Sequence, residues 1–123
     1  MAKSVNRYFS LLGQHRTLNT ARRLWNPAAD IYRTVDGWVV KVDLAGVAES
    51  DLEIIIEGNI LRISGVRRDT FCETDEVICQ QLEITYSRFE KILNFPNSIA
   101  DAKIIRDYRD GLLLLHLQTS WKK

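Results

Sequence analysis

The chain has 123 residues, of which 46% are hydrophobic, and it carries 17 basic and 16 acidic residues. This length suits one domain, and the apolar fraction is large enough for a core. The longest apolar run, Leu112 to Leu115, is far too short to span a membrane as a helix. The start of the sequence also lacks the apolar segment of a secretory leader, so we expect none. Two cysteines, Cys72 and Cys79, are too few for a disulfide framework, so we expect a reducing, cytoplasmic environment.

Charge is unevenly distributed along the chain. Residues 1–29 contain five bases and no acid, whereas residues 30–123 contain 12 bases and 16 acids, a net charge of −4. We therefore divide the chain into a basic N-terminal arm (1–26), a body (27–119) and a short tail (120–123). The arm is compatible with a transit peptide, a nucleic-acid-binding arm or a flexible extension. The extension is favoured because five bases in 29 residues is a modest density.

The arm has weak helical periodicity. Val5, Tyr8, Phe9 and Leu12 follow helical spacing, and a second apolar patch ends at Leu24 and Trp25. Isolated helices of this length are marginal in water. We therefore expect an arm that is partly helical or disordered until its apolar side meets a partner, with packing on the body as the alternative. Pro27 disfavours helix at the preceding residue and begins the body.

The first part of the body predicts an antiparallel sheet. A short strand is expected at 30–35, followed by a turn at Asp36-Gly37. Three further strands are expected at 38–44, 51–57 and 60–65, because apolar and polar residues alternate with period two. Gly58-Asn59 between the last two is typical of a tight hairpin turn.

A long, charged connection at 66–77 interrupts this pattern, and such connections inside compact domains are often functional. Beyond it we expect strands at 78–95, with a bend at Tyr86-Ser87, at 103–108 and at 112–118. Asp110-Gly111 predicts the turn between the last two. About eight short strands and no helix in the body indicate an antiparallel β-sandwich.

No constellation in the sequence predicts catalysis. The histidines are His15, in the arm, and His116, which alternation places on the opposite face from Leu115 and Leu117. A triad needs a nucleophile, a base and an acid within hydrogen-bond reach, and none is predicted. We expect no catalytic residue and no enzyme activity, but a binding or assembly protein.

Ligand motifs give the same expectation. The two cysteines lack further zinc ligands, and the acids of the long connection lack the glycine of a calcium loop. No phosphate-binding motif is present, and the acidic body has no basic stripe for nucleic acid. We expect no metal, no cofactor, no nucleic-acid partner and no membrane partner.

Five motifs in order carry a family resemblance. They are Trp25-Asn26-Pro27-Ala28-Ala29-Asp30-Ile31-Tyr32, Val42-Asp43-Leu44-Ala45-Gly46-Val47 with Asp51-Leu52, Ile60-Leu61-Arg62-Ile63-Ser64-Gly65, Tyr86-Ser87-Arg88-Phe89 through Phe95-Pro96, and Asp110-Gly111-Leu112-Leu113. From Trp25 to Leu117 the chain resembles the small heat-shock proteins, the alpha-crystallin-domain chaperones, and their bacterial branch above all. The resemblance implies an all-β, immunoglobulin-like antiparallel sandwich. It also implies an ATP-independent chaperone, a holdase that binds partly unfolded clients. The alternative is a sandwich interaction module, a co-chaperone or an assembly partner of another small heat-shock protein.

The resemblance assigns three sets of residues. Clients would bind the arm through Tyr8, Phe9, Leu11, Leu12, Leu18, Leu24 and Trp25. A groove would lie between two strands, lined by Leu52, Ile54, Ile56, Ile104 and Arg106. A homodimer or small oligomer would form by strand exchange of residues 66–78, with Thr70, Phe71, Cys72 and Lys91 at the interface.

Three features depart from the family pattern. Arg106 stands where the family has a small residue, and Lys91 stands where it often has arginine. The sequence ends at Trp121-Lys122-Lys123 without the I-x-I motif that docks in a neighbour's groove. We therefore expect dimers or small oligomers rather than a large cage. The alternative is an Arg106 that extends to solvent beside a working groove.

Overall fold

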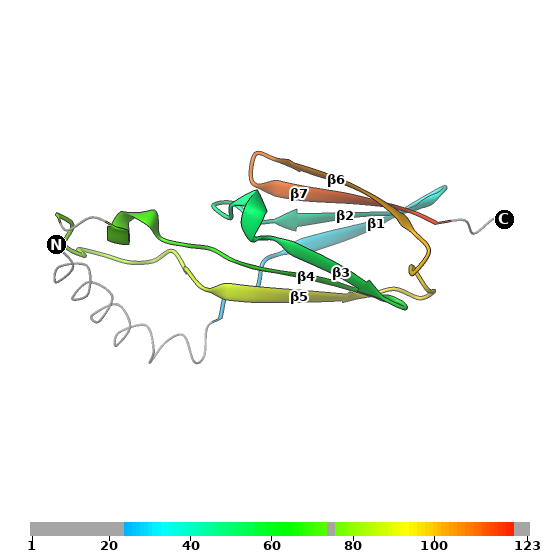
Figure 1. Ribbon diagram of the computed structural model, residues 1–123, viewed down its shortest axis with the longest axis horizontal. Helices are drawn as coiled ribbons and strands as arrows, with labels where there is room; N and C mark the ends of the chain where they lie inside the picture. Colours follow the sequence, from blue (N-terminus) through cyan, green and yellow to red (C-terminus); the bar gives the residue numbers. More distant parts are fainter. Residues whose placement is uncertain (1–23, 74–75, 120–123) are drawn as a thin grey trace.

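The computed structural model describes residues 24–73 and 76–119. These residues form seven strands and two short 3-10 helices: β1 (Ala29–Thr34), β2 (Gly37–Asp43), η1 (Glu49–Asp51), β3 (Glu53–Glu57), β4 (Ile60–Val66), η2 (Thr70–Glu73), β5 (Arg88–Asn94), β6 (Lys103–Arg109) and β7 (Leu112–Gln118). One sheet has the order β1-β2-β7-β6 and the other β3-β4-β5, and every pairing is antiparallel. Figure 1 shows them as two layers. The predicted antiparallel sandwich is confirmed.

Two hairpins build the four-stranded sheet. The turn between β6 and β7 places Asp110 at φ 57° and Gly111 at φ 79°, the left-handed pair that a two-residue hairpin needs. Gly37, at the start of β2, is required for a different reason. A Cβ atom at this position would lie 1.8 Å from the carbonyl oxygen of Leu117, so only glycine allows β2 and β7 to approach this closely.

The three-stranded sheet is closed by the predicted turn at Gly58-Asn59. The Asn59 side-chain amide donates to the carbonyl oxygen of Phe95 at 2.8 Å, and the Phe95 backbone N–H donates to the carbonyl of Asn59 at 2.9 Å. These two bonds attach the end of β5 to the β3–β4 turn. They also direct the chain toward the other sheet, where β6 begins.

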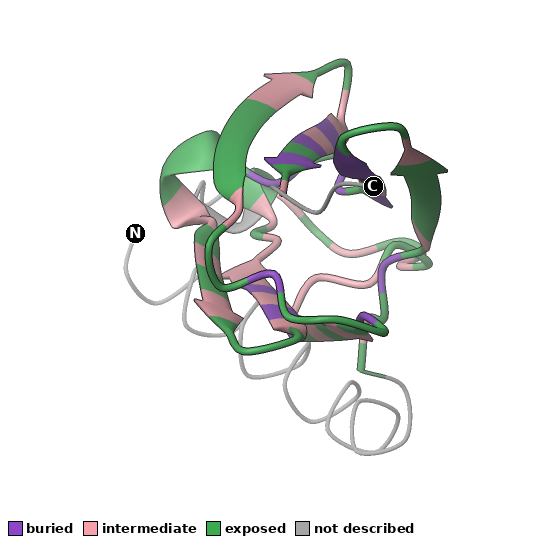
Figure 2. Ribbon diagram, turned by 90° about the vertical axis from the view of Figure 1, so that its right-hand side faces the viewer, coloured by how far each residue is buried: buried purple, intermediate pink, exposed green. Residues whose placement is uncertain are grey.

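The core lies between the two sheets, and Figure 2 shows buried and more exposed residues alternating along the strands. The buried hydrophobic residues are Trp38, Val40, Val42, Leu44, Val47, Leu61, Ile63, Phe89, Phe95, Ile99, Leu113, Leu115 and Leu117. Leu115 and Leu117 point inward and His116 is exposed, as the alternation predicted.

The strand predicted at 78–95 is wrong in its first half. Only Arg88–Asn94 forms a strand, and residues 76–87 follow an irregular path with no strand of the described chain paired to them. Thr70–Glu73, where the resemblance implied an exchanged strand, forms a 3-10 helix instead. Alternation shows which side chains could share a face, but a strand also needs a neighbour for its backbone groups.

Candidate interaction sites at the long loop and the sheet edges

The connection between β4 and β5, residues 67–87, is called the long loop below. It extends beyond the end of the sandwich (Figure 1). Arg67 closes its base. The Arg67 guanidinium donates to the carbonyl oxygens of Thr85 at 2.9 Å and Ala45 at 3.2 Å, and the backbone N–H donates to the carbonyl of Ser87 at 3.0 Å. One side chain therefore joins both ends of the loop to the connection that follows β2.

The same guanidinium lies over the ring of Trp25, 3.7 Å from its centroid. Trp25 also meets Phe89 of β5 edge to face, with ring centroids 5.1 Å apart. Trp25 is half-buried and packs against the core of the body. Only the exposed part of its surface is accessible to a client, and its role in client binding stays a prediction. Leu24 is 66% exposed. The other members of that set, Tyr8, Phe9, Leu11, Leu12 and Leu18, lie outside the described residues.

Arg68 makes a second attachment at the base of the loop. Its guanidinium donates two hydrogen bonds to the Asp51 carboxylate, at 3.1 and 3.3 Å. These hydrogen bonds, and the charge of Arg68, lower the pKa of Asp51. The pair holds the loop against η1, the short helix that leads into β3.

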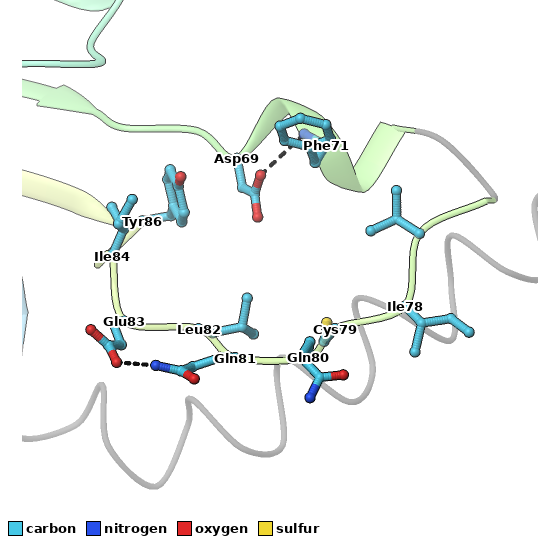
Figure 3. Close-up of a pocket in the computed structure, with 11 residues that line it drawn as sticks. Asp69, Phe71, Ile78, Cys79, Gln80, Gln81, Leu82, Glu83, Ile84 and Tyr86 are labelled. Carbon is cyan, nitrogen blue, oxygen red and sulfur yellow. Dashed lines mark hydrogen bonds between the residues drawn. The ribbon is translucent and has the colours of Figure 1, made fainter.

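The long loop borders an open pocket of about 250 Å³. Val77, Cys79 and Leu82 form a small apolar cluster there. In Figure 3, Leu82 points into this pocket and Asp69 points into it from the opposite side. Phe71 and Ile78 also border the pocket but are mostly exposed, at 69% and 90%. Cys79 is a free thiol, and the side chain of Cys72 lies outside the described part of the structure.

The predicted groove residues lie on two edge strands of different sheets. Ile54 and Ile56 face inward from β3 and are half-buried, and Leu52 just before the strand packs against the same core. Ile104 and Arg106 occupy β6, opposite the buried Leu117 and Leu115 of β7, so they also belong to its inward face. That these edges together bind a segment stays a prediction.

Contacts between β6 and the chain before β3 place the two edges on one side of the sandwich. Arg106 lies 4.0 Å from the Glu49 carboxylate, a long ion pair, and the arginine side chain is 39% exposed. The Tyr108 hydroxyl lies 2.7 Å from the carbonyl oxygen of Leu44 and 2.6 Å from that of Val47. Burial is the main cause that raises the pKa of Tyr108, with Glu49 and Asp43 adding to it and the hydrogen bond to Val47 opposing it.

Of the residues predicted at the dimer interface, Lys91 has a partner within the chain. It lies on β5 opposite the buried Ile63, and its ammonium donates to the side-chain oxygen of Asn26 at 3.2 Å. Lys91 therefore holds the entrance of the body beside Trp25. Thr70 and Phe71 lie on the exposed surface of η2. A dimer contact at any of these residues stays a prediction.

Arg67 was not singled out by the sequence. Its partners Trp25, Ala45 and Thr85 come from three separate segments, so no local spacing could have linked them. The position of Arg67 immediately after a strand, at the start of a long connection, was the available signal.

Ligand chemistry is limited in the part of the chain that the structure describes. No group of three or more histidine, cysteine or acidic residues there could hold a metal ion. None of the helices described is both long and apolar enough to cross a bilayer.

Fold and sites together define an immunoglobulin-like antiparallel sandwich with open strand edges and a projecting loop. The family model described as "Hsp20/alpha crystallin family" matches residues 30–123. The chain belongs to the Hsp20/alpha crystallin family.

Individual relatives agree with this assignment. The chain is 28% identical over 91 residues to "Spore protein SP21" of Stigmatella aurantiaca, covering 74% of this chain and 53% of that protein. It is 29% identical over 91 residues to "Heat shock protein HSP.16.4" of Streptococcus thermophilus, covering 72% of this chain and 62% of that protein. The match thus spans less than two thirds of these relatives' own length.

Solved structures show the same fold. "Heat shock protein 16.0 from Schizosaccharomyces pombe" aligns with a TM-score of 0.72 at 27% identity, covering 80% of this chain and 91% of that one. HspA from Xanthomonas axonopodis aligns with a TM-score of 0.63 at 27% identity, covering 78% of this chain and 95% of that one.

Proposed function

We propose that this protein is an ATP-independent chaperone that binds partly unfolded proteins and prevents their aggregation. The observation that carries the proposal is membership of the Hsp20/alpha crystallin family across the whole sandwich. The relatives named above as heat-shock proteins support it, and we place the activity in the cytoplasm.

The geometry of the sheets supports the proposal. β1, β3, β5 and β6 are the outer strands of their sheets, so each has one backbone side with no strand of the described residues beside it. Unfolding proteins expose apolar segments that extend readily along such edges. Ile54 and Ile56 on β3 and Ile104 on β6 offer apolar surface at two of them. Passive binding of this kind is driven by burial of apolar surface and consumes no nucleotide.

A homodimer or small oligomer by strand exchange is part of the proposal. Residues 76–80 alternate between exposed and half-buried side chains, the pattern of a strand, although no strand of the described chain pairs with them. β5 is the outer strand of the three-stranded sheet, and among residues 24–73 and 76–119 no strand pairs with its outer side. Pairing of the long loop with the sheet of a second copy would satisfy the backbone groups of both.

Heat-induced aggregation of a labile test enzyme tests the chaperone proposal. Turbidity is followed with the protein at ratios from one quarter to two subunits per enzyme, and an equal mass of an unrelated β-sandwich protein serves as the control. We expect suppression at or below an equimolar ratio, unchanged by removal of ATP. Unchanged turbidity at equimolar ratio, with circular dichroism showing a folded sandwich, would contradict the proposal. It would favour the alternative, an interaction module that assembles with another family member.

A further inference from the structure

The residues through which the chain enters the body are held to different degrees. Pro27 is fully buried, and the Asn26 side-chain oxygen accepts a hydrogen bond at 3.2 Å from an ammonium group of β5. Trp25 is half-buried under the Arg67 guanidinium, whereas Leu24 before it is 66% exposed. Trp25 is therefore the outermost packed residue at this entrance. A partner that displaces the chain at Leu24 acts on Trp25 first.

Both ends of the long loop contribute to the seat of Trp25. The guanidinium of Arg67, the first residue of the loop, lies 3.7 Å from the centroid of the Trp25 ring. The Trp25 backbone N–H donates at 3.4 Å to the hydroxyl of Ser87, the last residue of the loop. The Trp25 ring also meets Phe89 of β5 edge to face. We call the contacts of Trp25 with Arg67, Ser87 and Phe89 the tryptophan seat. Withdrawal of Trp25 removes a contact from each end of the loop.

Arg67 connects the tryptophan seat to the returning end of the loop. Its guanidinium also donates to the carbonyl oxygens of Thr85 and Ala45, and its backbone N–H donates to the carbonyl of Ser87 at 3.0 Å. An arginine side chain has several rotatable bonds, and fixing them costs conformational entropy. Because stacking on the Trp25 ring already fixes the planar guanidinium, its hydrogen bonds to Thr85 and Ala45 form with less further loss. Without the ring, both hydrogen bonds weaken together.

We propose that the tryptophan seat couples residues 1–24 to the long loop. With Trp25 seated, Arg67 holds the returning end of the loop, residues 84–87, against the sandwich. With Trp25 withdrawn, residues 84–87 open locally while the two sheets stay folded. The coupling is reciprocal, because a loop whose base is held by Arg67 also retains Trp25.

As a contact, this coupling is independent of the chaperone activity. As regulation, it rests on the proposed function. A client that binds residues 1–24 and withdraws Trp25 loosens the same loop that is proposed to pair with a second copy.

Amide hydrogen exchange of the full chain, followed by mass spectrometry without client, tests the contact. In Trp25→Leu we expect exchange in residues 66–70 and 84–88 to accelerate about three- to tenfold. Trp25→Phe keeps a ring under Arg67 and should show a smaller acceleration. Exchange in β7, which lies in the middle of the other sheet, reports unfolding of the whole sandwich and should not change.

The reverse direction and the control use two further variants. In Arg67→Lys we expect exchange in residues 24–28 to accelerate, because lysine lacks the planar group that stacks on Trp25. Tyr32→Leu is the matched control, since it removes another aromatic ring with a cation over it, the Lys41 ammonium at 5.4 Å. Exchange in residues 66–70 should stay as in the wild type.

Two results would overturn the coupling. One is unchanged exchange in residues 66–70 and 84–88 when Trp25 is replaced by leucine. The other is an equal acceleration in β7 or in the Tyr32→Leu control, which would show general loosening.

The regulatory role is tested by adding excess reduced, carboxymethylated lactalbumin, an unfolded client, to the wild type. We expect protection in residues 1–24 together with faster exchange in residues 84–88. Protection in residues 1–24 without that acceleration would overturn the regulatory role. Absence of any protection would count against the proposed function and the regulatory role together, while the variants still decide the contact.

Discussion

The Arg67 guanidinium lies over the ring of Trp25, 3.7 Å from the ring centroid, and so joins two residues that are far apart in the sequence. The stack connects the entrance of the body to the base of the long loop. Cation–π contacts of this type are worth about 0.5–2 kcal/mol, depending on how far the pair is removed from water. The two hydrogen bonds from the same guanidinium to Thr85 and Ala45 add the connection after β2 to the junction.

Replacement of Arg67 is expected to loosen this junction. Arg67→Ala removes the stack and leaves two carbonyl oxygens without their charged donor, so we expect a loss of about 2–3 kcal/mol in the free energy of unfolding. Arg67→Lys should recover only part of it, because lysine cannot reproduce the planar fork of donors. Urea denaturation followed by tryptophan fluorescence measures the effect. Arg109→Ala is the control, since the Arg109 side chain is 73% exposed and forms an ion pair with the nearby Asp107. Equal losses at both positions would contradict the role of Arg67.

The Tyr108 hydroxyl is expected to stabilise the connection between β2 and β3. Tyr108→Phe removes its contacts with the Leu44 and Val47 carbonyls, and we expect a loss of about 1 kcal/mol in the free energy of unfolding. Tyr32→Phe is the matched control, because the Tyr32 ring is 46% exposed and its hydroxyl lies 3.4 Å from Asp30. Thermal unfolding of the two variants under the same conditions measures both losses of stability. A control loss as large as that at Tyr108 would refute the prediction.

Alkaline pH should lower the stability of the fold through ionisation of Tyr108. The pKa of Tyr108 is raised in the folded state, chiefly by burial. Its stabilising contribution is therefore complete below the unfolded tyrosine pKa of about 10 and is lost as pH rises through the raised pKa. The urea midpoint of the wild type should fall between pH 9 and pH 11 more steeply than that of Tyr108→Phe. Parallel curves for the two proteins would contradict this assignment.

Acid should weaken the attachment of the loop to η1. The pKa of Asp51 is lowered by its hydrogen bonds to Arg68, so the stabilisation is complete above the unfolded aspartate pKa of about 3.9 and is lost as pH falls through the lowered value. Asp51→Asn should flatten this part of the profile of stability against pH between pH 5 and pH 2.5. Asp101→Asn, which removes an exposed carboxylate outside the pair, is the matched control. The slope of the urea midpoint against pH is the measurement.

Alanine substitutions at Gly37 and Gly58 distinguish the cost of a steric clash between strands from the cost of a left-handed backbone conformation. Gly37→Ala places a Cβ 1.8 Å from the Leu117 carbonyl oxygen, so β2 and β7 must separate, and we expect a loss of more than about 3 kcal/mol or failure to fold. Gly58→Ala meets no atom within 4 Å and bears only the cost of φ +62° at the β3–β4 turn, about 1–2 kcal/mol. Thermal unfolding midpoints measure both. Tolerance of alanine at position 37 would contradict the register of β2 and β7.

Arg106 is expected to limit the apolar character of the β6 edge. Its ion pair with Glu49 is long and exposed, so Arg106→Ala should change the free energy of unfolding by less than about 0.5 kcal/mol. The substitution should increase binding of a hydrophobic fluorescent dye, because the apolar surface beside Ile104 becomes accessible to the dye. Arg109→Ala, on the outward face of the same strand, is the control. Equal dye binding by wild type and Arg106→Ala would show that the arginine already lies clear of that surface.

The sequence predicted much of the sandwich because strands and hairpin turns leave patterns among neighbouring residues. Alternation located the strands from β1 to β4 and the last two strands, and Gly58-Asn59 and Asp110-Gly111 located two hairpin turns. The same alternation in residues 78–87 predicted a strand that is absent. A strand needs a neighbour for its backbone, and periodicity carries no information about whether a neighbour exists.

The candidate sites were predictable only in part. The inward face of Ile54 and Ile56 follows from period two, and so does that of Ile104 and Arg106. The ion pair of Arg106 with Glu49 and the bond from Lys91 to Asn26 do not follow, because each joins residues distant in the chain.

By itself, then, the sequence determined the all-β class, the family and the distribution of charge between the basic arm and the acidic body. These depend on residue order and composition alone. Tertiary structure decided that Trp25 is packed under Arg67, that residues 76–87 form no strand, and that the long loop borders an open pocket. Each of these depends on contacts between segments that only folding brings together, since the energy of a stack, a strand pair or a pocket wall resides in its partner as much as in the residue itself.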